Sequence, residues 1–269
     1  MAVAAMGHNG VNHMETSDIN VCVLRIEGTN NEQEMYDAFK RLGAHAEMVH
    51  LNEFTSLDKY QCLMIPGGFS SGDYIRAGAI FASRIRSTFG DELMDFVRSG
   101  YAVGGICNGF QVLVELGLLP GFAGEEGSVN ACLSRNDSAR FECRHSVLVH
   151  TPSENCAFTG LLPEGEQLVI PSAHAEGKLL LEGGEKAYEK LEKNGQIVFK
   201  YADLEGNTDA GYPWNPNGSP HNIAGICNER GNVFGMMPHP ERAYFAQNKN
   251  GFSGRTVFES VVGYLEEQF

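Results

Sequence analysis

The sequence lacks a surplus of basic residues. Lys and Arg together number 20 against 34 Asp and Glu, which gives a formal net charge of -14. Binding to nucleic acid depends on cationic groups that neutralise phosphates, and no basic stretch is visible in the sequence. No apolar run approaches the roughly 18 residues that a membrane-spanning helix needs. These absences argue against nucleic acid and membranes as partners.

The first 18 residues lack the features of a secretory signal. They contain neither a basic start nor a long apolar stretch. We interpret residues 1–18 as a flexible extension and expect a single domain over residues 19–269. The seven cysteines form no CxxC pair and their number is odd, so we expect reduced thiols in a cytoplasmic protein.

The order of the predicted elements indicates an α/β fold. Short apolar stretches at about 20–26, 44–51, 61–65 and 101–106 alternate with helical patterns at 35–42, 73–87, 91–98 and 107–116. Short Gly-rich turns join them. This pattern favours a flavodoxin-like, doubly wound, mostly parallel central sheet flanked by helices. Ligands of such sheets bind beyond the carboxyl ends of the strands.

The pattern changes after about residue 128. Residues 140–150 alternate between polar and apolar side chains, and short strands are predicted at 168–171, 178–181 and 196–201. The stretch 203–222 holds the only Trp and three prolines, which predicts a loop. A final hairpin over 222–227 and 232–237 and a terminal helix over 254–267 follow. We therefore expect additional antiparallel strands in the second half.

The strongest local signal for chemistry is Gly105-Ile106-Cys107-Asn108-Gly109. It matches a G-x-nucleophile-x-G elbow, in which the nucleophile lies at a sharp turn between a strand and a helix. The helix that follows directs its N–H groups and its positive dipole end at the sulfur, which favours the thiolate. A buried core cysteine among small residues is the alternative interpretation.

Two further segments complete a candidate acyl-transfer site. His239 and Glu241, within Pro238-His239-Pro240-Glu241, could supply a base and the carboxylate that orients it. Pro66-Gly67-Gly68 follows a predicted strand and could expose backbone N–H donors to an oxyanion. Alone, each segment fits a plain turn, but together with the elbow they favour a Cys-His-Glu triad.

Together these segments resemble the class I (triad) glutamine amidotransferases. Gly105, Cys107, Gly109 and Gln111 meet the G-x-C-x-G-x-Q signature of that class in full. Within the class, residues 19–268 are similar to the glutaminase family of formylglycinamidine ribonucleotide synthesis, in purine biosynthesis. The similarity to this family is carried by Arg25–Asn30, Pro66–Ser70, Asp73-Tyr74, Arg76–Gly78, Asn136, Ser138, Phe141, Cys143-Arg144, Tyr212–His221 and Met237–Arg242.

The resemblance implies a set of roles. Cys107 would attack the side-chain amide of glutamine, with His239 as the base and Glu241 aligning it. The backbone N–H groups of Gly68 and Asn108 would form the oxyanion hole. The resemblance also implies glutamine contacts from Gly67, Phe69, Gln111, Asn136, Ser138 and Phe141. Two positions depart from the family pattern, because Asn31 stands where Cys is usual and Ala175 stands where Gly is usual. Since position 31 is not the nucleophile, we expect no loss of activity there.

The resemblance also implies partners. Ammonia would pass to a separate synthetase subunit, and a small accessory subunit is a further expected partner. ATP and magnesium would serve the synthetase, because this chain has no G-x-x-x-x-G-K-[ST] loop. We predict no cofactor and no metal site in this chain itself.

Three alternatives stay open at this point. The chain could be the glutaminase subunit of another amidotransferase. It could be a flavodoxin-like cysteine hydrolase or chaperone, although these usually carry His directly after the elbow cysteine, where this chain has Asn108. It could also be an inactive binding subunit, against which the presence of Cys107, His239 and Glu241 together argues.

Overall fold

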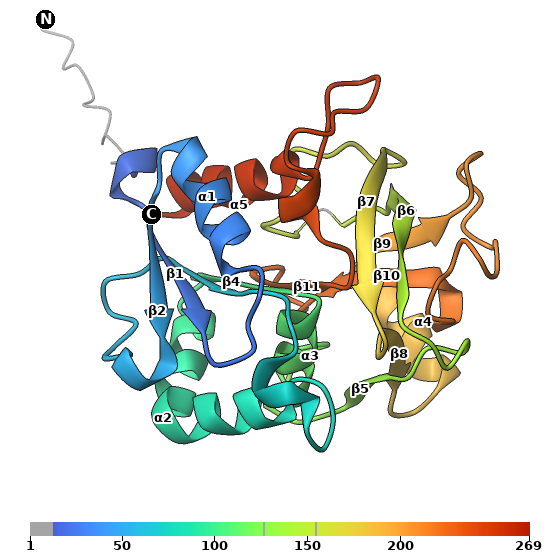
Figure 1. The fold of residues 1–269 in the computed structure, drawn as a ribbon. Helices are drawn as coiled ribbons and strands as arrows, with labels where there is room; N and C mark the ends of the chain where they lie inside the picture. Colours follow the sequence, from blue (N-terminus) through green and yellow to red (C-terminus); the bar gives the residue numbers. More distant parts are fainter. Residues whose placement is uncertain (1–12, 126, 154) are drawn as a thin grey trace, which may run out of the picture.

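The computed structural model describes residues 13–125, 127–153 and 155–269. Within these ranges the main sheet has nine strands in the order β2-β1-β3-β4-β11-β10-β9-β6-β7 (Figure 1). The first five pair in parallel. Their bounds are β1 Asn20–Arg25, β2 His45–His50, β3 Cys62–Ile65, β4 Ala102–Ile106 and β11 Val233–Met236. With β11 as the fifth strand, this is the flavodoxin-like order, and the predicted fold class is confirmed.

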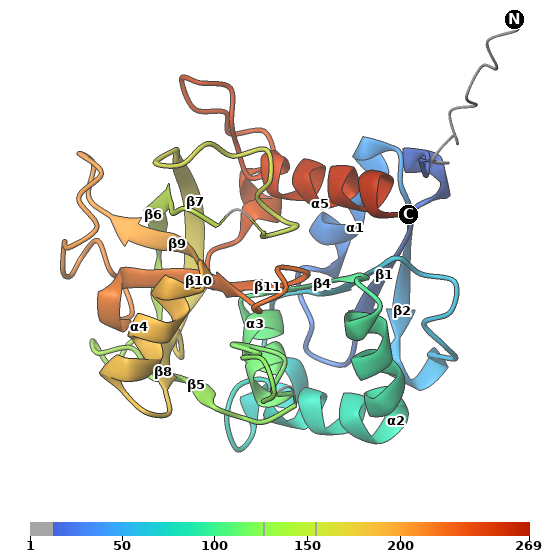
Figure 2. The same ribbon diagram turned by 180° about the vertical axis from the view of Figure 1, so that it is seen from behind.

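Helices cover both faces of the parallel part. Helices α1 (Glu32–Leu42) and α5 (Arg255–Gln268) lie on one face, and α2 (Ala79–Arg98) and α3 (Asn108–Glu115) lie on the other (Figures 1 and 2). Every residue of β3 and β4 is buried. Strands covered on both faces are expected to be continuously apolar, which explains the short unbroken apolar runs in this half of the sequence.

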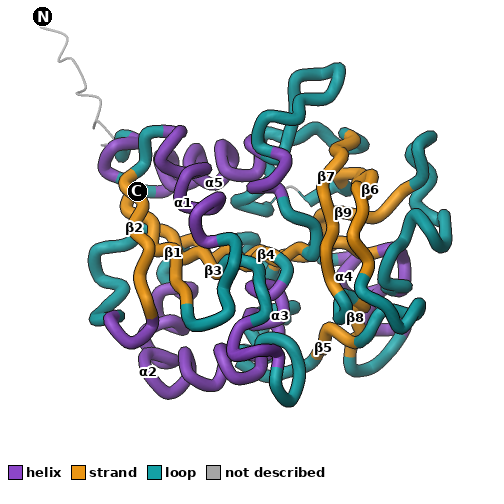
Figure 3. The backbone as a smooth tube through the Cα atoms, viewed as in Figure 1, coloured by secondary structure: helices purple, strands orange, loops and turns teal. Residues whose placement is uncertain are grey.

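The second half extends the sheet with antiparallel strands. These are β6 (Glu142–His150), β7 (Gln167–His174), β9 (Ile197–Ala202) and β10 (Ile223–Cys227). The predicted hairpin is confirmed, since β10 pairs antiparallel with β11. Strands β5 (Ala131–Ser134) and β8 (Lys178–Leu181) form a separate two-stranded sheet beside α4 (Glu185–Lys193) (Figure 3). Strand β7 ends the main sheet, so one of its edges pairs with no other strand of that sheet.

The structure corrects several predicted elements. The two helices predicted at 73–87 and 91–98 are one helix, α2, with a local break at Phe89. The start at residue 73 was wrong because Ser71, Asp73 and Ile75 have positive φ, which a right-handed helix excludes. Strand β5 and helix α4 were not predicted.

The N-terminal extension falls mostly outside the described residues. Residues 1–12 are not described, whereas residues 13–18 include a 3-10 turn at Thr16–Asp18. The Thr16 hydroxyl donates a hydrogen bond to the Glu266 carboxylate on α5. The domain boundary at residue 19 stays a prediction. In the described part of the chain, no helix is both long and apolar enough to span a membrane.

Candidate active site

The three predicted motifs follow three neighbouring strands. Pro66-Gly67-Gly68 follows β3, Cys107 follows β4, and Pro238-His239 lies just beyond β11. Parallel strands end at the same edge of a sheet, so their following loops meet there. The strand order therefore brings the segment at His239 together with two segments that precede it by more than a hundred residues.

Cys107 has the backbone geometry of a nucleophile elbow. Its φ of 53° and ψ of -106° are unusual for a residue with a side chain, and it occupies the N-cap of α3. Its N–H donates to Met236 O at 2.8 Å, which ties the elbow to β11. A Cβ on Gly109 would lie 1.9 Å from Ile65 O, so only glycine allows helix and strand to approach this closely. The predicted strand–turn–helix context is confirmed.

His239 and Glu241 form a buried pair beside the elbow. His239 Nδ1 lies 2.6 Å from Glu241 Oε1, and their side chains are 2% and 0% exposed. Burial by itself would lower the pKa of His239, but the charges of Glu241 and Cys107 and hydrogen bonds to both raise that pKa to about 10. The imidazole therefore holds a proton strongly, as an acceptor of a thiol proton must.

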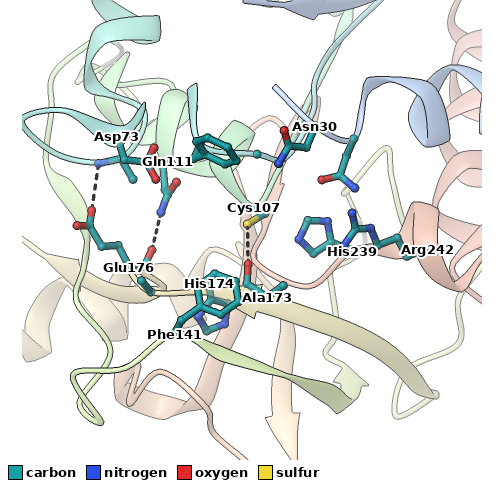
Figure 4. Close-up of a pocket in the computed structure, with 15 residues that line it drawn as sticks. Asn30, Asp73, Cys107, Gln111, Phe141, Ala173, His174, Glu176, His239 and Arg242 are labelled. Carbon is teal, nitrogen blue, oxygen red and sulfur yellow. Dashed lines mark hydrogen bonds between the residues drawn. The ribbon is translucent and has the colours of Figure 1, made fainter. Parts of the chain in front are cut away.

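Cys107 lines a cavity of about 380 Å³ (Figure 4). Its wall opposite α3 includes the free edge of β7, where the Cys107 thiol donates to Ala173 O at 3.5 Å. The predicted residues that line it are Gly68, Phe69, Cys107, Gln111, Phe141 and His239. Gly67 lies beside the cavity, since a Cβ there would meet His239 Cε1 at 2.7 Å. The cavity thus brings most of the predicted site together.

Asn136 and Ser138 lie elsewhere. The Asn136 Nδ2 group donates to His174 O at 2.8 Å, and its Oδ1 accepts from Gly177 N at 3.1 Å. Asn136 therefore holds the segment that borders the cavity. Ser138 lines a separate cavity of about 520 Å³ together with Tyr212. The structure does not bring these two side chains to Cys107, and their contact with glutamine stays a prediction.

Several residues that were not predicted as site residues also line the cavity. They are Asn30, Asn31, Asp73, Ala77, Ala173, His174, Ala175, Glu176 and Arg242. Asn30, Asp73, Ala77 and Arg242 lie inside the motifs quoted for the family resemblance, and those motifs were the available signal. The Asn31 amide, with its oxygen turned toward Arg242, accepts from Arg242 Nε at 2.8 Å and from Nη2 at 2.7 Å. Asn31, which stands where the family usually has Cys, is therefore held in the cavity wall beside His239.

Two of these residues have shifted proton affinities. Burial and the nearby charge of Glu176 raise the pKa of Asp73 to about 6. Burial and the charge of His239 lower the pKa of His174 to about 4. Among the described residues, no three His, Cys, Asp or Glu side chains gather in a way that could hold a metal ion.

The fold and this site together define a glutamine amidotransferase domain. The family described as "CobB/CobQ-like glutamine amidotransferase domain" matches residues 18–262. Phosphoribosylformylglycinamidine synthase subunit PurQ of Archaeoglobus fulgidus is 49% identical, with 94% of this chain and 100% of the relative covered. The subunit of the same name from Picrophilus torridus is 47% identical, with 85% and 89% covered. The chain belongs to the PurQ family of phosphoribosylformylglycinamidine synthase subunits.

A solved structure supports the same assignment. A chain of the PurLQS structure from Thermotoga maritima is similar with a TM-score of 0.70 and 33% identity. The match covers 92% of this chain and 99% of that one. The likeness therefore spans both the parallel and the antiparallel halves of the fold.

Proposed function

We propose that this chain hydrolyses L-glutamine to glutamate and ammonia through Cys107, His239 and Glu241. The observation that carries the proposal is the juxtaposition, in one cavity, of an elbow cysteine with a buried, carboxylate-paired histidine. A thiol beside such a base is the arrangement that nucleophilic acyl transfer requires. The ammonia serves the formation of formylglycinamidine ribonucleotide in purine biosynthesis, the reaction of the PurQ family.

In the first half-reaction Cys107 Sγ attacks the side-chain amide carbon of glutamine. The thiol proton passes to His239, and Glu241 stabilises the resulting imidazolium. The C–N bond then breaks, His239 gives its proton to the leaving nitrogen, and ammonia departs from a glutamyl thioester. The raised pKa of His239 favours transfer of the thiol proton to the imidazole.

In the second half-reaction water attacks the thioester. His239 takes a proton from the water and returns it to the Cys107 sulfur as the C–S bond breaks. Glutamate leaves and the thiol is regenerated. The Pro171 carbonyl accepts from the His239 N–H at 2.8 Å, which holds the histidine backbone in place through both half-reactions.

The oxyanion of each intermediate needs two donors, which we assign to the N–H groups of Gly68 and Asn108. In the described part of the chain neither N–H donates to another backbone carbonyl. Gly68 has a φ of 143°, and a Cβ there would lie 2.6 Å from Gly28 O. Only glycine therefore allows this loop to lie against residues 28–30 beside the cavity.

The partners follow from the family. We propose a synthetase subunit that uses ATP and magnesium, together with a small accessory subunit, since the similar Thermotoga maritima chain comes from a PurLQS structure. All seven cysteines are free, which fits the expected cytoplasmic location. Asn108, which donates to Gln111 Oε1 and Asp73 Oδ1, occupies the place of the histidine expected in the cysteine hydrolases and chaperones.

The test compares two nitrogen sources in the assembled synthetase complex. Cys107→Ala is expected to abolish glutamine-dependent synthesis and to leave ammonium-dependent synthesis unchanged, because the thiol serves only to release ammonia. Cys62→Ala, at a buried cysteine in the core, is the matched control for loss of a thiol. Retained glutaminase activity in Cys107→Ala would refute the proposed function.

A further inference from the structure

The charges in the cavity are divided between its two ends. Asp73 and Glu176 lie on one side of Cys107, close to Gln111, whereas His239 and Arg242 lie on the other (Figure 4). Glu176 Oε2 accepts from Ala77 N at 3.0 Å, and Asp73 Oδ1 accepts from Asn108 Nδ2 at 3.3 Å. Both carboxylates are thereby held in place at the acidic end.

The carboxylates of the acidic end have no paired cation in the described part of the chain. Among the described residues, neither Asp73 nor Glu176 forms an ion pair. Arg76, whose charge interacts with Glu176, directs its guanidinium to Glu115, with two contacts of 2.5 Å. Two close carboxylates without a counter-ion repel each other, so the acidic end is most stable with a positive group between them.

The cavity wall also carries an acceptor without a donor. His174 is 3% exposed, and its Nδ1 lies 3.1 Å from Asn136 Oδ1. The Asn136 amide nitrogen donates to the carbonyls of Arg140 and His174, which fixes the other amide atom as the oxygen. Because this oxygen can only accept, the Nδ1 atom of His174 carries the proton. His174 Nε2 is then a bare acceptor, and it has no partner in the described structure. A buried, unsatisfied acceptor in the same cavity points independently to a ligand rich in N–H donors.

Gln111 is already engaged by the protein. Its Nε2 donates to Glu176 O at 2.6 Å, and its Oε1 accepts from Asn108 Nδ2 at 2.9 Å. Through these bonds Gln111 joins the nucleophile elbow to the segment that carries Glu176. Gln111 therefore fixes the distance between the sulfur and the acidic end, and the carboxylates are left to contact the ligand.

We propose that Asp73 and Glu176 bind the α-ammonium group of glutamine while Cys107 attacks the side-chain amide at the other end of the substrate. This inference rests on the proposed glutaminase function. A primary ammonium offers three N–H donors and one positive charge, which matches the free acceptors and the charge at the acidic end. The pair selects amino acids with a free α-amino group over simple amides and over Nα-blocked glutamine.

The experiment measures kcat/KM in the synthetase complex with two amides. One is L-glutamine and the other is glutaramate, which is glutamine without its α-amino group. Asp73→Asn and Glu176→Gln are each expected to lower kcat/KM for glutamine by about 10- to 100-fold, the size of a lost charge-assisted hydrogen bond. The value for glutaramate should stay within about threefold, since no ammonium is present to lose its partner.

Two controls separate the possible failures. Asp91→Asn, at an exposed carboxylate on α2, should change neither value. Equal losses with both amides in Asp73→Asn and in Glu176→Gln would overturn the ammonium assignment, because a structural role damages every substrate alike. Cys107→Ala tests the proposed function separately, since hydrolysis of either amide by that variant would refute the role of the thiol itself.

Discussion

Gly67 sets the spacing between the nucleophile and its base. A Cβ on this residue would lie 2.7 Å from His239 Cε1, 3.4 Å from Cys107 Cβ and 3.0 Å from the side-chain amide of Asn31. The backbone of Gly67 does not have a positive φ, so alanine is allowed by conformation and is opposed only by its neighbours. Gly67→Ala therefore tests the spacing of the triad with one methyl group.

The size of the effect follows from the available room. The His239 ring must move by at least the 0.7 Å that separates 2.7 Å from the 3.4 Å of ordinary contact. The ring is 2% exposed and is held to Glu241 at 2.6 Å, so it has little freedom to move without leaving its hydrogen bond. A misplacement of about 1 Å in an active site can cost on the order of 100-fold in rate. We expect kcat for glutamine hydrolysis to fall by about that factor.

The assay is steady-state glutamine hydrolysis in the assembled complex, with ammonium-dependent synthesis measured in parallel. Gly160→Ala is the matched control, since a Cβ there would meet nothing within 4 Å. Thermal unfolding of both variants shows whether the fold is retained. A Gly67→Ala enzyme with kcat within twofold of the wild type would refute the spacing argument.

Four further outcomes are expected. His239→Ala should nearly stop glutamine turnover, whereas Glu241→Gln should retain more activity. The double variant should be little worse than His239→Ala, because the effects of substitutions within one catalytic unit are not additive. An unchanged rate in Glu241→Gln would show that Glu241 is not a member of the triad. A glutamine-mimicking electrophile at substoichiometric dose should label Cys107 first, as read by peptide mapping; predominant label at the exposed Cys132 or Cys143 would contradict this. Because folding raises the pKa of His239 from 6.5 to about 10, its stabilising contribution is complete below pH 6.5 and is lost as pH rises through about 10. Urea unfolding should therefore show a stability gap between wild type and Glu241→Gln that narrows as the pH approaches 10, and a constant gap would refute the coupling. The isolated chain should hydrolyse glutamine slowly and accelerate when the synthetase and its ligands bind; equal rates would exclude such gating.

The parts of the site that could be predicted from sequence are those encoded by local motifs at strand ends. The elbow around Cys107 and the segment around His239 each carry their own turn chemistry. The parallel order then brings their strands together, and β4 and β11 are neighbours in the sheet. Cys107 can be placed beside His239 from these motifs and from the rule that parallel strands end at the same edge of a sheet.

The parts that could not be predicted depend on long-range pairing. The wall opposite Cys107 comes from β7, whose position at the sheet edge is decided by its pairing with β6 and by no local pattern. Asp73 is brought to the cavity by a loop with three positive-φ residues, which resembles a helix start by composition alone. Helix α4 was missed because only Ala187, Tyr188 and Leu191 form its buried stripe among charged residues.

The edge of β7 links the second half of the chain to catalysis. The unpaired edge of a strand normally exposes backbone groups that invite aggregation. Here the Pro171 carbonyl accepts from the His239 N–H at 2.8 Å, and the Ala173 carbonyl accepts from the Cys107 thiol at 3.5 Å. Proline fits this edge because the donor it lacks would face the catalytic segments and not a neighbouring strand. The antiparallel half therefore does more than complete the core, because its edge strand β7 holds both the base and the nucleophile. It does so through backbone carbonyls, which no side-chain substitution on β7 can remove.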